Sequence, residues 1–346
     1  MKSPRSTDWP TAALELAGLL PCERLQASAC AAGERLRGPW LVAFSGGADS
    51  LALLLLLWAH WPERRGRLVA LHFNHRLRGR ASQADAVFCR RVCAALRIDI
   101  RVGQWTTAPR KPSEAEARMA RHAFFREELR ALRGRGLWLG HQMDDVAESL
   151  LMRLARGSGL SGLAAPRPVQ PMPGKRVHLR PLLTLRKDEL AAALMKVRAA
   201  WREDSTNAGG DYLRNRVRLT VIPPWVKAAG RDALAGAALS RSLLEEDDAA
   251  LDAWVEELAP FGRDGSLDLA KTARRPVGLI RRVLRRWLND QCPEVELSRQ
   301  GFEQLLALMR GGKASRFSLG RKSFAVIARG SLRVEKAVGY TQALRS

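Results

Sequence analysis

Residues 40–61 constrain the fold of this chain more than any other segment. Residues 40–44 are all apolar, which predicts a buried strand. A loop with two glycines follows at residues 45–50, and the helical pattern of residues 50–61 is apolar on nearly all sides. Because such a helix has almost no face for water, it must lie between a sheet and another layer. The segment therefore predicts a strand–loop–helix unit inside a layered α/β domain.

Strands and helices continue to alternate through the first two thirds of the chain. Apolar runs predict further strands at residues 68–73, 98–102, 137–139 and 177–179. Helical patterns lie between and after them, at residues 82–96, 114–132, 143–156 and 187–199. This order is typical of a parallel sheet with helices on both faces, in which ligands bind at the carboxyl edge of the strands. The proline-rich residues 166–173 are expected to be irregular.

The pattern changes after about residue 218. Helices are expected at residues 233–258, 277–288 and 300–309, and short strands at residues 317–319, 324–328 and 332–335. We expect three parts: a partly helical N-terminal extension (1–38), an α/β domain (39–218) and a smaller, mostly helical α+β domain (219–346).

The charge of the chain indicates a polyanionic partner. There are 58 Lys and Arg residues against 35 Asp and Glu residues, a formal net charge of +23. An excess this large is most often associated with nucleic acid. A genome biased toward arginine codons would explain part of the excess, but it explains less well why so few acids balance it.

The cysteines and the N-terminus argue against several protein classes. The chain has five cysteines: Cys22, Cys30, Cys89, Cys93 and Cys292. They form no C-x-x-C pair, which argues against a disulfide framework, a zinc ribbon and a cysteine-held iron–sulfur cluster. The first eight residues are polar, unlike a signal peptide, and the apolar run 51–58 is too short to span a bilayer. We expect a cytoplasmic protein with no membrane partner.

The loop at residues 45–50 has the composition of a phosphate-binding loop. Gly46 and Gly47 let the backbone turn tightly and bring its N–H groups close to an anion, and the next helix adds its positive end. Ser45 and Ser50 supply hydroxyl donors, and Asp49 could hold Mg²⁺ against phosphate oxygens. The loop lacks both the Walker pattern and G-x-G-x-x-G. An ordinary glycine turn at the end of a strand is the alternative.

The complete loop resembles the S-G-G-x-D-S signature of the N-type ATP pyrophosphatases, the PP-loop superfamily. The resemblance implies a Rossmann-like domain that uses ATP and Mg²⁺, cleaves ATP between its α and β phosphates, and leaves AMP on a carbonyl oxygen of the substrate. It implies that six residues bind ATP: Ser45, Gly46, Gly47, Ala48, Asp49 and Ser50.

Four further segments are similar to those of one branch of this superfamily, the tRNA(Ile)-lysidine synthetases. The first, residues 72–78, resembles H-x-N-H-G-L-R, with Arg76 where glycine is usual. The resemblance makes His75 a candidate substrate contact. A histidine that serves only the local structure is the alternative.

The second segment, residues 114–121, resembles the family's E-x-x-A-R-x-x-R helix. Glu114, Arg118 and Arg121 share one helical face at three- and four-residue spacing. The resemblance makes them candidates for a wall of the nucleotide or lysine site. A surface ladder of ion pairs is the alternative.

The third segment, residues 139–149, is similar to L-A-H-H-x-D-D-Q-A-E-T and carries the candidate catalytic acids. Asp144 is the first candidate to orient the attacking amine and accept its proton, and Asp145 is the second. Glu148, one helical turn after Asp144, is a candidate lysine or metal contact. Three positions depart from the pattern: Gln142, Val146 and Ser149.

The fourth segment, residues 153–163, resembles R-L-x-R-G-S-G-L-x-G-L. It makes Arg153, Arg156, Gly157 and Ser158 candidate contacts to phosphate or RNA backbone. Surface charges and a glycine helix cap are the alternatives. Residues 180–183, 204–207 and 214–218 also match family segments, and the end of the chain is similar to the family's small C-terminal domain.

The resemblance implies a substrate and a reaction. The substrate would be an isoleucine tRNA with a CAU anticodon, whose wobble cytidine is adenylated on its C2 oxygen. The ε-amine of L-lysine would then displace AMP and form lysidine. A row of arginines at residues 281–286 could bind RNA phosphates or form a solvated helix face.

Three other functions share some of these features. A tRNA 2-thiolase shares the loop and the RNA but usually carries paired cysteines. An amide-forming synthetase shares the loop but lacks the R-G-S-G segment and the charge. A non-enzymatic RNA-binding protein would fit the charge but not the acid cluster. The sequence does not indicate an oligomeric state.

Overall fold

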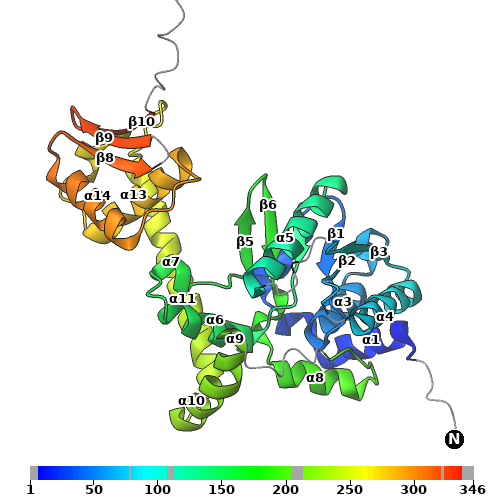
Figure 1. Ribbon diagram of the computed structural model, residues 1–346. Helices are drawn as coiled ribbons and strands as arrows, with labels where there is room; N and C mark the ends of the chain where they lie inside the picture. The colour runs from blue at the N-terminus through cyan, green and yellow to red at the C-terminus, as the bar shows by residue number, and fades with distance from the viewer. Residues whose placement is uncertain are drawn as a thin grey trace, which may run out of the picture. The chain divides into compact units, whose positions relative to one another are not determined.

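The computed structural model describes residues 7–77, 79–106, 109, 113–203, 213–320 and 323–336 (Figure 1). It divides the chain into two compact units, Met1–Glu245 and Glu246–Ser346, and the division falls within helix α11 (Ala233–Leu258). The expected boundary at residue 218 therefore lies inside the first unit. The expected N-terminal extension is also part of that unit.

The first unit is built on a six-stranded sheet with the order β3-β2-β1-β4-β6-β5. Its strands are β1 (Trp40–Ala43), β2 (Leu68–Asn74), β3 (Asp99–Gln104), β4 (Gly136–Trp138), β5 (Val169–Met172) and β6 (Arg176–Leu179). β1 lies in the middle of the parallel part, with Trp40 opposite Leu68 on one side and Gly136 on the other. The predicted parallel sheet is confirmed, except that β5 pairs antiparallel with β6.

The expectation of an irregular proline-rich segment is wrong for residues 169–172, which form β5. Pro171 is tolerated because β5 is the edge strand, where a backbone N–H is not needed on the outer side. The turn into β6 uses left-handed backbone at Gly174 (φ 77°) and Lys175 (φ 56°). The proline-rich composition of this segment gives no indication that it forms an edge strand.

One face of the sheet carries most of the helices. They are α1 (Trp9–Leu19), α2 (Ala27–Glu34), α3 (Ala48–His60), α4 (Arg80–Leu96) and α8 (Lys187–Lys196). Their apolar residues form one core with Trp40 and Val42 of β1, and the residues of α3 from Leu51 to Leu57 are fully buried in it. Ala13, Leu16 and Cys30 of the N-terminal segment belong to the same core.

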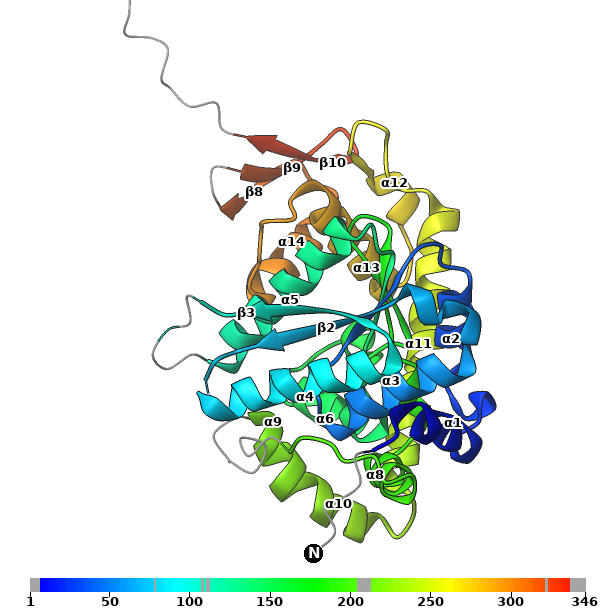
Figure 2. The same cartoon turned by 90° about the vertical axis from the view of Figure 1, so that its right-hand side faces the viewer.

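Helix α5 (Glu114–Ala131) covers the opposite face. Phe125 and Leu129 pack there against Leu41 of β1 and Leu137 of β4. Figure 2 shows α3 and α4 on one side of the sheet and α5 on the other. The predicted helices on both faces are confirmed.

The rest of the first unit connects and extends this core. It contains α6 (Met143–Leu154), α7 (Leu160–Leu163), α9 (Leu213–Arg216), α10 (Ile222–Ala229), the π-helix η5 (Val217–Val221) and the 3₁₀ turns η1 (Cys22–Arg24), η2 (Pro62–Arg67) and η3 (Pro181–Thr184). Ala147 of α6 packs with Val217, Ile222 and Leu234. This cluster joins the acid-bearing helix α6 to η5.

The second unit is a small α+β fold, as the sequence predicts. It contains α12 (Leu269–Thr272), α13 (Val277–Gln291), α14 (Arg299–Gly311) and the antiparallel strands β7 (Leu267–Asp268), β8 (Ser315–Gly320), β9 (Ser323–Ala328) and β10 (Ser331–Lys336), in the order β7-β10-β9-β8. Leu284, Trp287, Leu305 and Leu332 are buried in its core. Ser298 caps α14, where its hydroxyl accepts from the Gly301 N–H at 3.1 Å.

Two further structural facts bear on the class of protein. In the part of the chain that the structure describes, no helix has both the length and the apolar character needed to cross a membrane. All five cysteines are free thiols.

Candidate active site

The loop at residues 45–50 joins β1 to α3 and is closed by its own serines. The Ser45 N–H donates to Ser50 Oγ at 3.2 Å, and the Gly47 N–H donates to Ser45 Oγ at 3.3 Å. The Ser50 hydroxyl donates to the Gly47 carbonyl at 3.0 Å. The two hydroxyls that we expected to face phosphate thus hold the shape of the loop, and Gly47 is the N-cap of α3.

Position 46 requires glycine. Its φ is 91°, which L-residues with a side chain rarely adopt, and a Cβ there would lie 3.2 Å from Cys89 Sγ. The Arg202 N–H donates to the Gly46 carbonyl at 2.9 Å, so the segment after α8 lies against the loop. The Arg202 Nε in turn donates to Asp85 of α4 at 2.8 Å. Sequence reasoning missed Arg202, which belongs to no quoted motif.

Asp49 links the loop to the acid-bearing segment. Burial, and after it the charge of Asp145, raise the pKa of the Asp49 carboxyl to about 7. Lys187 and Arg218 act in the opposite direction. One carboxylate oxygen, Oδ1, is buried and accepts no hydrogen bond from the described residues. Two motifs nearly one hundred residues apart in the sequence therefore share one electrostatic site.

Asp49 is also the residue that could hold a metal ion. A buried carboxylate oxygen without a donor suits a hard cation such as Mg²⁺. Across the described ranges, no group of three or more His, Cys, Asp and Glu side chains is placed to hold a metal. A Mg²⁺ ion here would therefore take most of its ligands from phosphate oxygens and water.

Helix α6 begins with a capping box that uses Gln142. The Gln142 side-chain oxygen accepts from the Asp144 N–H at 2.5 Å, and the Gln142 N–H donates to the Asp145 carboxylate at 3.0 Å. Gln142 is fully buried. The departure from the family pattern at this position therefore leaves the start of the acid-bearing helix intact.

Two arginines neutralise two of the three candidate acids. The buried Glu148 carboxylate accepts from Arg214 Nε at 2.6 Å and from Arg218 Nε at 2.5 Å. Asp145 accepts from Arg214 Nη2 at 2.6 Å. Both arginines belong to the R-N-x-x-R segment in α9 and η5, 66 and 70 residues after Glu148 in the sequence.

Asp144 differs from its two neighbours. Its Oδ2 accepts from the Lys187 backbone N–H at 3.0 Å, at the start of α8, and no described arginine forms an ion pair with it. Asp144 is half-buried, whereas Asp145 and Glu148 are buried. Of the three acids, Asp144 is the one whose carboxylate forms no ion pair with a residue that the structure describes.

A cationic cluster with neutral histidines lies beside this site. Arg180 Nε donates to His141 Nδ1 at 3.3 Å, which requires a neutral imidazole. The His122 and His178 rings stack with their centroids 6.0 Å apart. Burial and the nearby arginines, including Arg118 and Arg180, lower the pKa of both histidines to about 4. The sequence offered no motif for His122 or His178.

The comparisons with known proteins agree with this geometry. A family model described as the PP-loop domain matches residues 24–225. This chain belongs to the PP-loop family, whose domains bind ATP. Its relatives include the tRNA(Ile)-lysidine synthase of Geobacter sulfurreducens, 35% identical over 281 residues that cover 78% of this chain and 58% of the relative. The tRNA(Ile)-lysidine synthase of Chlorobaculum tepidum is 42% identical over 192 residues, which cover 53% of this chain and 55% of the relative. The chain spans about half the length of these curated relatives.

A solved structure supports the fold alone. The U34-tRNA thiolase NcsA from Methanococcus maripaludis superposes with a TM-score of 0.50 at 17% identity, covering 68% of this chain and 78% of the thiolase. At this identity the likeness shows that both chains share the PP-loop fold.

Within the PP-loop domain, residues 72–76 form a rigid support behind the loop. His72 is buried, and its Nδ1 lies 3.0 Å from the carbonyl of Phe44, the residue before the loop. Asn74 Oδ1 accepts from the Arg76 N–H at 2.8 Å, and Arg76 is left-handed (φ 59°). His75 is half-buried, with its ring edge-to-face on Phe73 at 4.8 Å. The histidine assigned to local structure is thus His72, and a substrate role for His75 stays a prediction.

The R-G-S-G segment of the PP-loop domain forms the end of α6 and the turn after it. Arg153 Nη1 donates to the Gly162 carbonyl at 2.7 Å, and Gly157 is left-handed (φ 67°) as in a helix cap. Arg156 is exposed, and Ser158 is half-buried. The backbone of the helix cap therefore accounts for glycine at position 157. The expected contacts of this segment to phosphate stay predictions. The side chain of Glu114, and residues 204–207, lie outside the described residues.

In the second unit, the arginine row of α13 is largely paired within the protein. Arg282 pairs with Asp248 and, at 2.7 Å, with Asp252, while Arg281 pairs with Glu303. Arg286 pairs with Glu256 at 2.5 Å. Three arginines of this row are therefore paired with acids of the same unit, an outcome that differs both from RNA binding and from the solvated helix face. Acids distant in the sequence supply the partners, which is why the pattern did not reveal them.

Proposed function

We propose that this chain is a tRNA(Ile)-lysidine synthase. It would join L-lysine to C2 of the wobble cytidine of an isoleucine tRNA with a CAU anticodon, and release AMP and diphosphate from ATP. The observation that carries the proposal is that Asp49 lies close enough to Asp144 and Asp145 of α6 to feel their charges, in a chain whose named relatives are lysidine synthases.

In the first step the phosphate loop would hold the diphosphate part of ATP. The backbone N–H groups near Gly46 and Gly47 and the positive end of α3 favour an anion, and Asp49 would contribute an oxygen ligand to Mg²⁺. The C2 oxygen of the cytidine bonds to the α-phosphorus while the bond between the α and β phosphates breaks. Diphosphate leaves, and the C2 oxygen carries AMP.

In the second step Asp144 would act on lysine. An ammonium group is no nucleophile, so a carboxylate must orient it and accept its proton. The amine nitrogen then bonds to C2, and AMP leaves with the former C2 oxygen. Asp145 and Glu148 would contact lysine only if Arg214 or Arg218 moved away, because these arginines occupy them.

Contacts to the RNA would come from the cationic side of the site. The proposed contacts to substrate or phosphate are His75, Glu114, Arg118, Arg121, Arg153, Arg156, Gly157 and Ser158, of which Glu114, Arg118 and Arg121 would form a wall of the nucleotide or lysine site. The net charge of +23 supports an RNA substrate, since basic side chains release the counterions of nucleic acid. Burial and the charge of Arg118 lower the pKa of Arg180 to about 10, and the charge of Asp145 acts in the opposite direction.

The thiolase alternative is less well supported. Cys89 and Cys93 lie one turn apart in α4, but both thiols are buried. Burial raises the pKa of each, to about 12 for Cys93. A thiol must ionise to carry sulfur, so these two are poorly suited to that chemistry.

Labelled lysine provides the decisive test. The protein is incubated with ATP, Mg²⁺, labelled lysine and an isoleucine tRNA with a CAU anticodon, and each component is omitted in turn. The proposal expects incorporation into RNA only when all are present, with one AMP formed per lysine. A tRNA with uridine at the wobble position is the matched control. ATP-dependent transfer of sulfur without lysine incorporation would identify a thiolase instead.

A further inference from the structure

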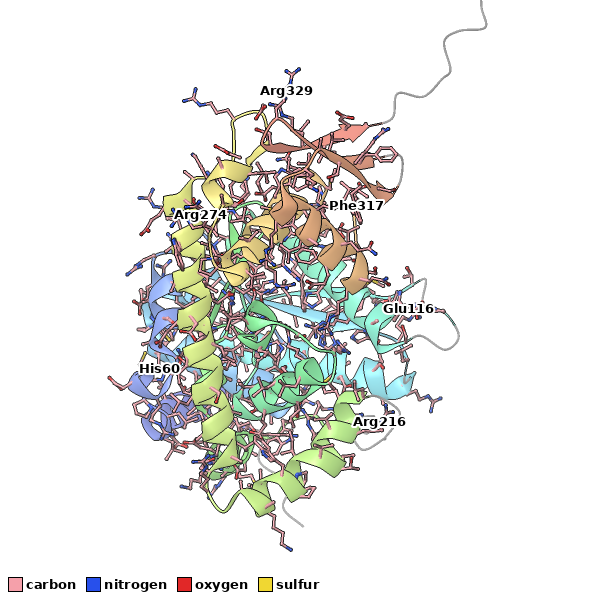
Figure 3. All side chains as sticks on the ribbon, turned by 90° about the vertical axis from the view of Figure 1, so that its left-hand side faces the viewer. His60, Glu116, Arg216, Arg274, Phe317 and Arg329 are labelled. Atoms are coloured by element: carbon pink, nitrogen blue, oxygen red, sulfur yellow. The ribbon has the colours of Figure 1, made fainter. Side chains whose placement is uncertain are left out.

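We propose that a pocket in the second unit binds a backbone phosphate of the RNA substrate. The pocket has a volume of about 340 Å³, and its wall includes three basic residues, Lys271, Arg274 and Arg275. Figure 3 labels Arg274 on the segment that joins α12 to α13. Its lining also includes Leu258 and one acid, Glu257.

The arginines of the pocket differ from those of the neighbouring helix α13 in their ion pairs. Arg281, Arg282 and Arg286 of α13 already pair with carboxylates. Within the described ranges, no ion pair involves Arg274 or Arg275, and both side chains are exposed. Lys271 Nζ donates to the Ala259 carbonyl at 2.6 Å, which leaves two of its three N–H bonds for a ligand. Three cations therefore converge on one concave surface with a single carboxylate.

The backbone around the pocket is held in unfavourable conformations. Arg274 has a φ of 58° and Ala259 a φ of 42°, both in the left-handed region that favours glycine. The Arg275 N–H donates to the Thr272 carbonyl at 3.2 Å, and this bond closes the turn that carries Arg274. Strained residues often mark a functional site, and here one of them is Arg274, which lines the pocket together with Arg275.

The lining favours phosphate over a nucleotide base. Arg and Lys are the usual donors to RNA phosphate oxygens, and guanidinium groups can bind them with two parallel bonds. Recognition of an unpaired base usually needs an aromatic ring to stack on, and no aromatic side chain lines this pocket. The pocket would therefore position the RNA without reading its sequence. This inference rests on the proposed function for the identity of the anion, an RNA phosphodiester.

The test measures the salt dependence of tRNA binding by the full chain. An R274Q/R275Q variant and the unmodified protein are titrated with isoleucine tRNA from about 50 to about 200 mM KCl. We expect roughly 10-fold weaker binding at the lowest salt, and a log–log salt slope reduced by about 1–2 in magnitude. In the lysine assay, KM for tRNA should rise while kcat at saturating tRNA stays unchanged.

Two variants serve as controls. R310Q removes one exposed positive charge of the same unit outside the pocket and should change the slope much less. R274K/R275K keeps the charges and should retain most of the slope. The inference is overturned if R274Q/R275Q binds like the unmodified protein, if R310Q is equally defective, or if no tRNA binding is measurable. Because binding requires no turnover, a chain that binds tRNA through this pocket but transfers no lysine would contradict the proposed function alone.

Discussion

At the scale of single residues, Asp49 shows how a functional carboxylate can lower the stability of the fold that carries it. Its pKa is raised to about 7, mainly by burial, while an unfolded aspartate ionises near 3.8. The folded protein therefore binds more protons than the unfolded chain between these two values. Linkage then requires the free energy of unfolding to fall as pH rises through that range.

The first prediction follows from this decrease in the free energy of unfolding with rising pH. Asp49→Asn should raise the free energy of unfolding by about 1–2 kcal/mol at about pH 8, a value reduced from the full shift because Asp49 is partly exposed. At about pH 4.5 the substitution should have a much smaller effect, because this pH is close to the unfolded pKa of 3.8 and little of the cost of keeping the folded carboxyl protonated has yet accumulated. Urea unfolding at both pH values measures this. Equal changes in the free energy of unfolding at the two pH values would contradict the burial of the Asp49 carboxyl. The variant should lose activity at both pH values.

Asp144 carries the second prediction. Asp144→Asn should lower lysine incorporation by at least about 10³-fold, since the amide cannot accept the proton of the amine. The amide oxygen can still accept from the Lys187 N–H, so the fold and tRNA affinity should be preserved. Asp188→Asn, an exposed acid of α8, is the matched control and should retain activity. Normal turnover by the Asp144 variant would refute the assignment.

Arg76 carries the third prediction. The arginine occupies a left-handed position (φ 59°), which explains why glycine is usual there in the family pattern. Arg76→Gly should stabilise the protein by about 0.5–1 kcal/mol, because only glycine adopts this φ without steric cost. Arg91→Gly, at an exposed position inside α4, should instead destabilise by about 1 kcal/mol. The two opposite signs in urea unfolding distinguish backbone strain from a general effect of glycine.

At the scale of elements, α6 and the α9–η5 segment form one charged unit. Arg214 and Arg218 lie four residues apart, and both reach the Glu148 carboxylate. The π-helix η5, which starts at Val217, is a local departure from α-helical geometry of the kind found at functional sites. Movement of this segment would expose Asp145 and Glu148 to a ligand.

The fourth prediction tests this coupling. Glu148→Gln should cost about 2–4 kcal/mol, because it leaves two half-buried guanidinium groups without the counter-charge of a buried carboxylate. Arg218→Gln should also destabilise, and the double variant should be more stable than the sum of the two losses predicts. Arg216→Gln, on the same segment, is the control outside the Glu148 ion pairs. Additive losses would show that the pair does not interact in solution.

At the scale of the whole molecule, the net charge of +23 is the property that bears on partners. The acids that pair with arginines of α13 are already subtracted in this value, so the ion pairs leave the excess of 23 basic residues unchanged. This excess of positive charge should attract a polyanion over a long range and speed its association with the protein.

The fifth prediction concerns this long-range effect. Affinity for tRNA should fall at least about 10-fold between about 50 and about 200 mM KCl, because bound phosphates displace counterions. Raising the osmolarity by the same amount with an uncharged solute, at a constant low KCl concentration, should leave the affinity nearly unchanged. A flat dependence on salt would contradict an RNA-binding role for the charge.

Much of the fold and part of the site could be predicted from local pattern. The strand–loop–helix of residues 40–61 was predictable because an apolar run, two glycines and an all-apolar helix permit few arrangements. The acid cluster of α6 was predictable from its own segment. The edge strand β5 was not, because a proline is acceptable there only once the neighbours of the strand are known.

The sequence by itself determined the family, the order of layers and the residue types at the candidate site, since these depend on short segments with recognisable chemistry. Only the tertiary structure decided which charges are available. It pairs Glu148 with Arg214 and Arg218, and it pairs Arg282 with Asp248. It also leaves Asp144, Arg274 and Arg275 without such partners among the described residues. The physical reason is that Coulomb interactions depend on distance in space and on burial, and neither is encoded in the spacing of residues along the chain.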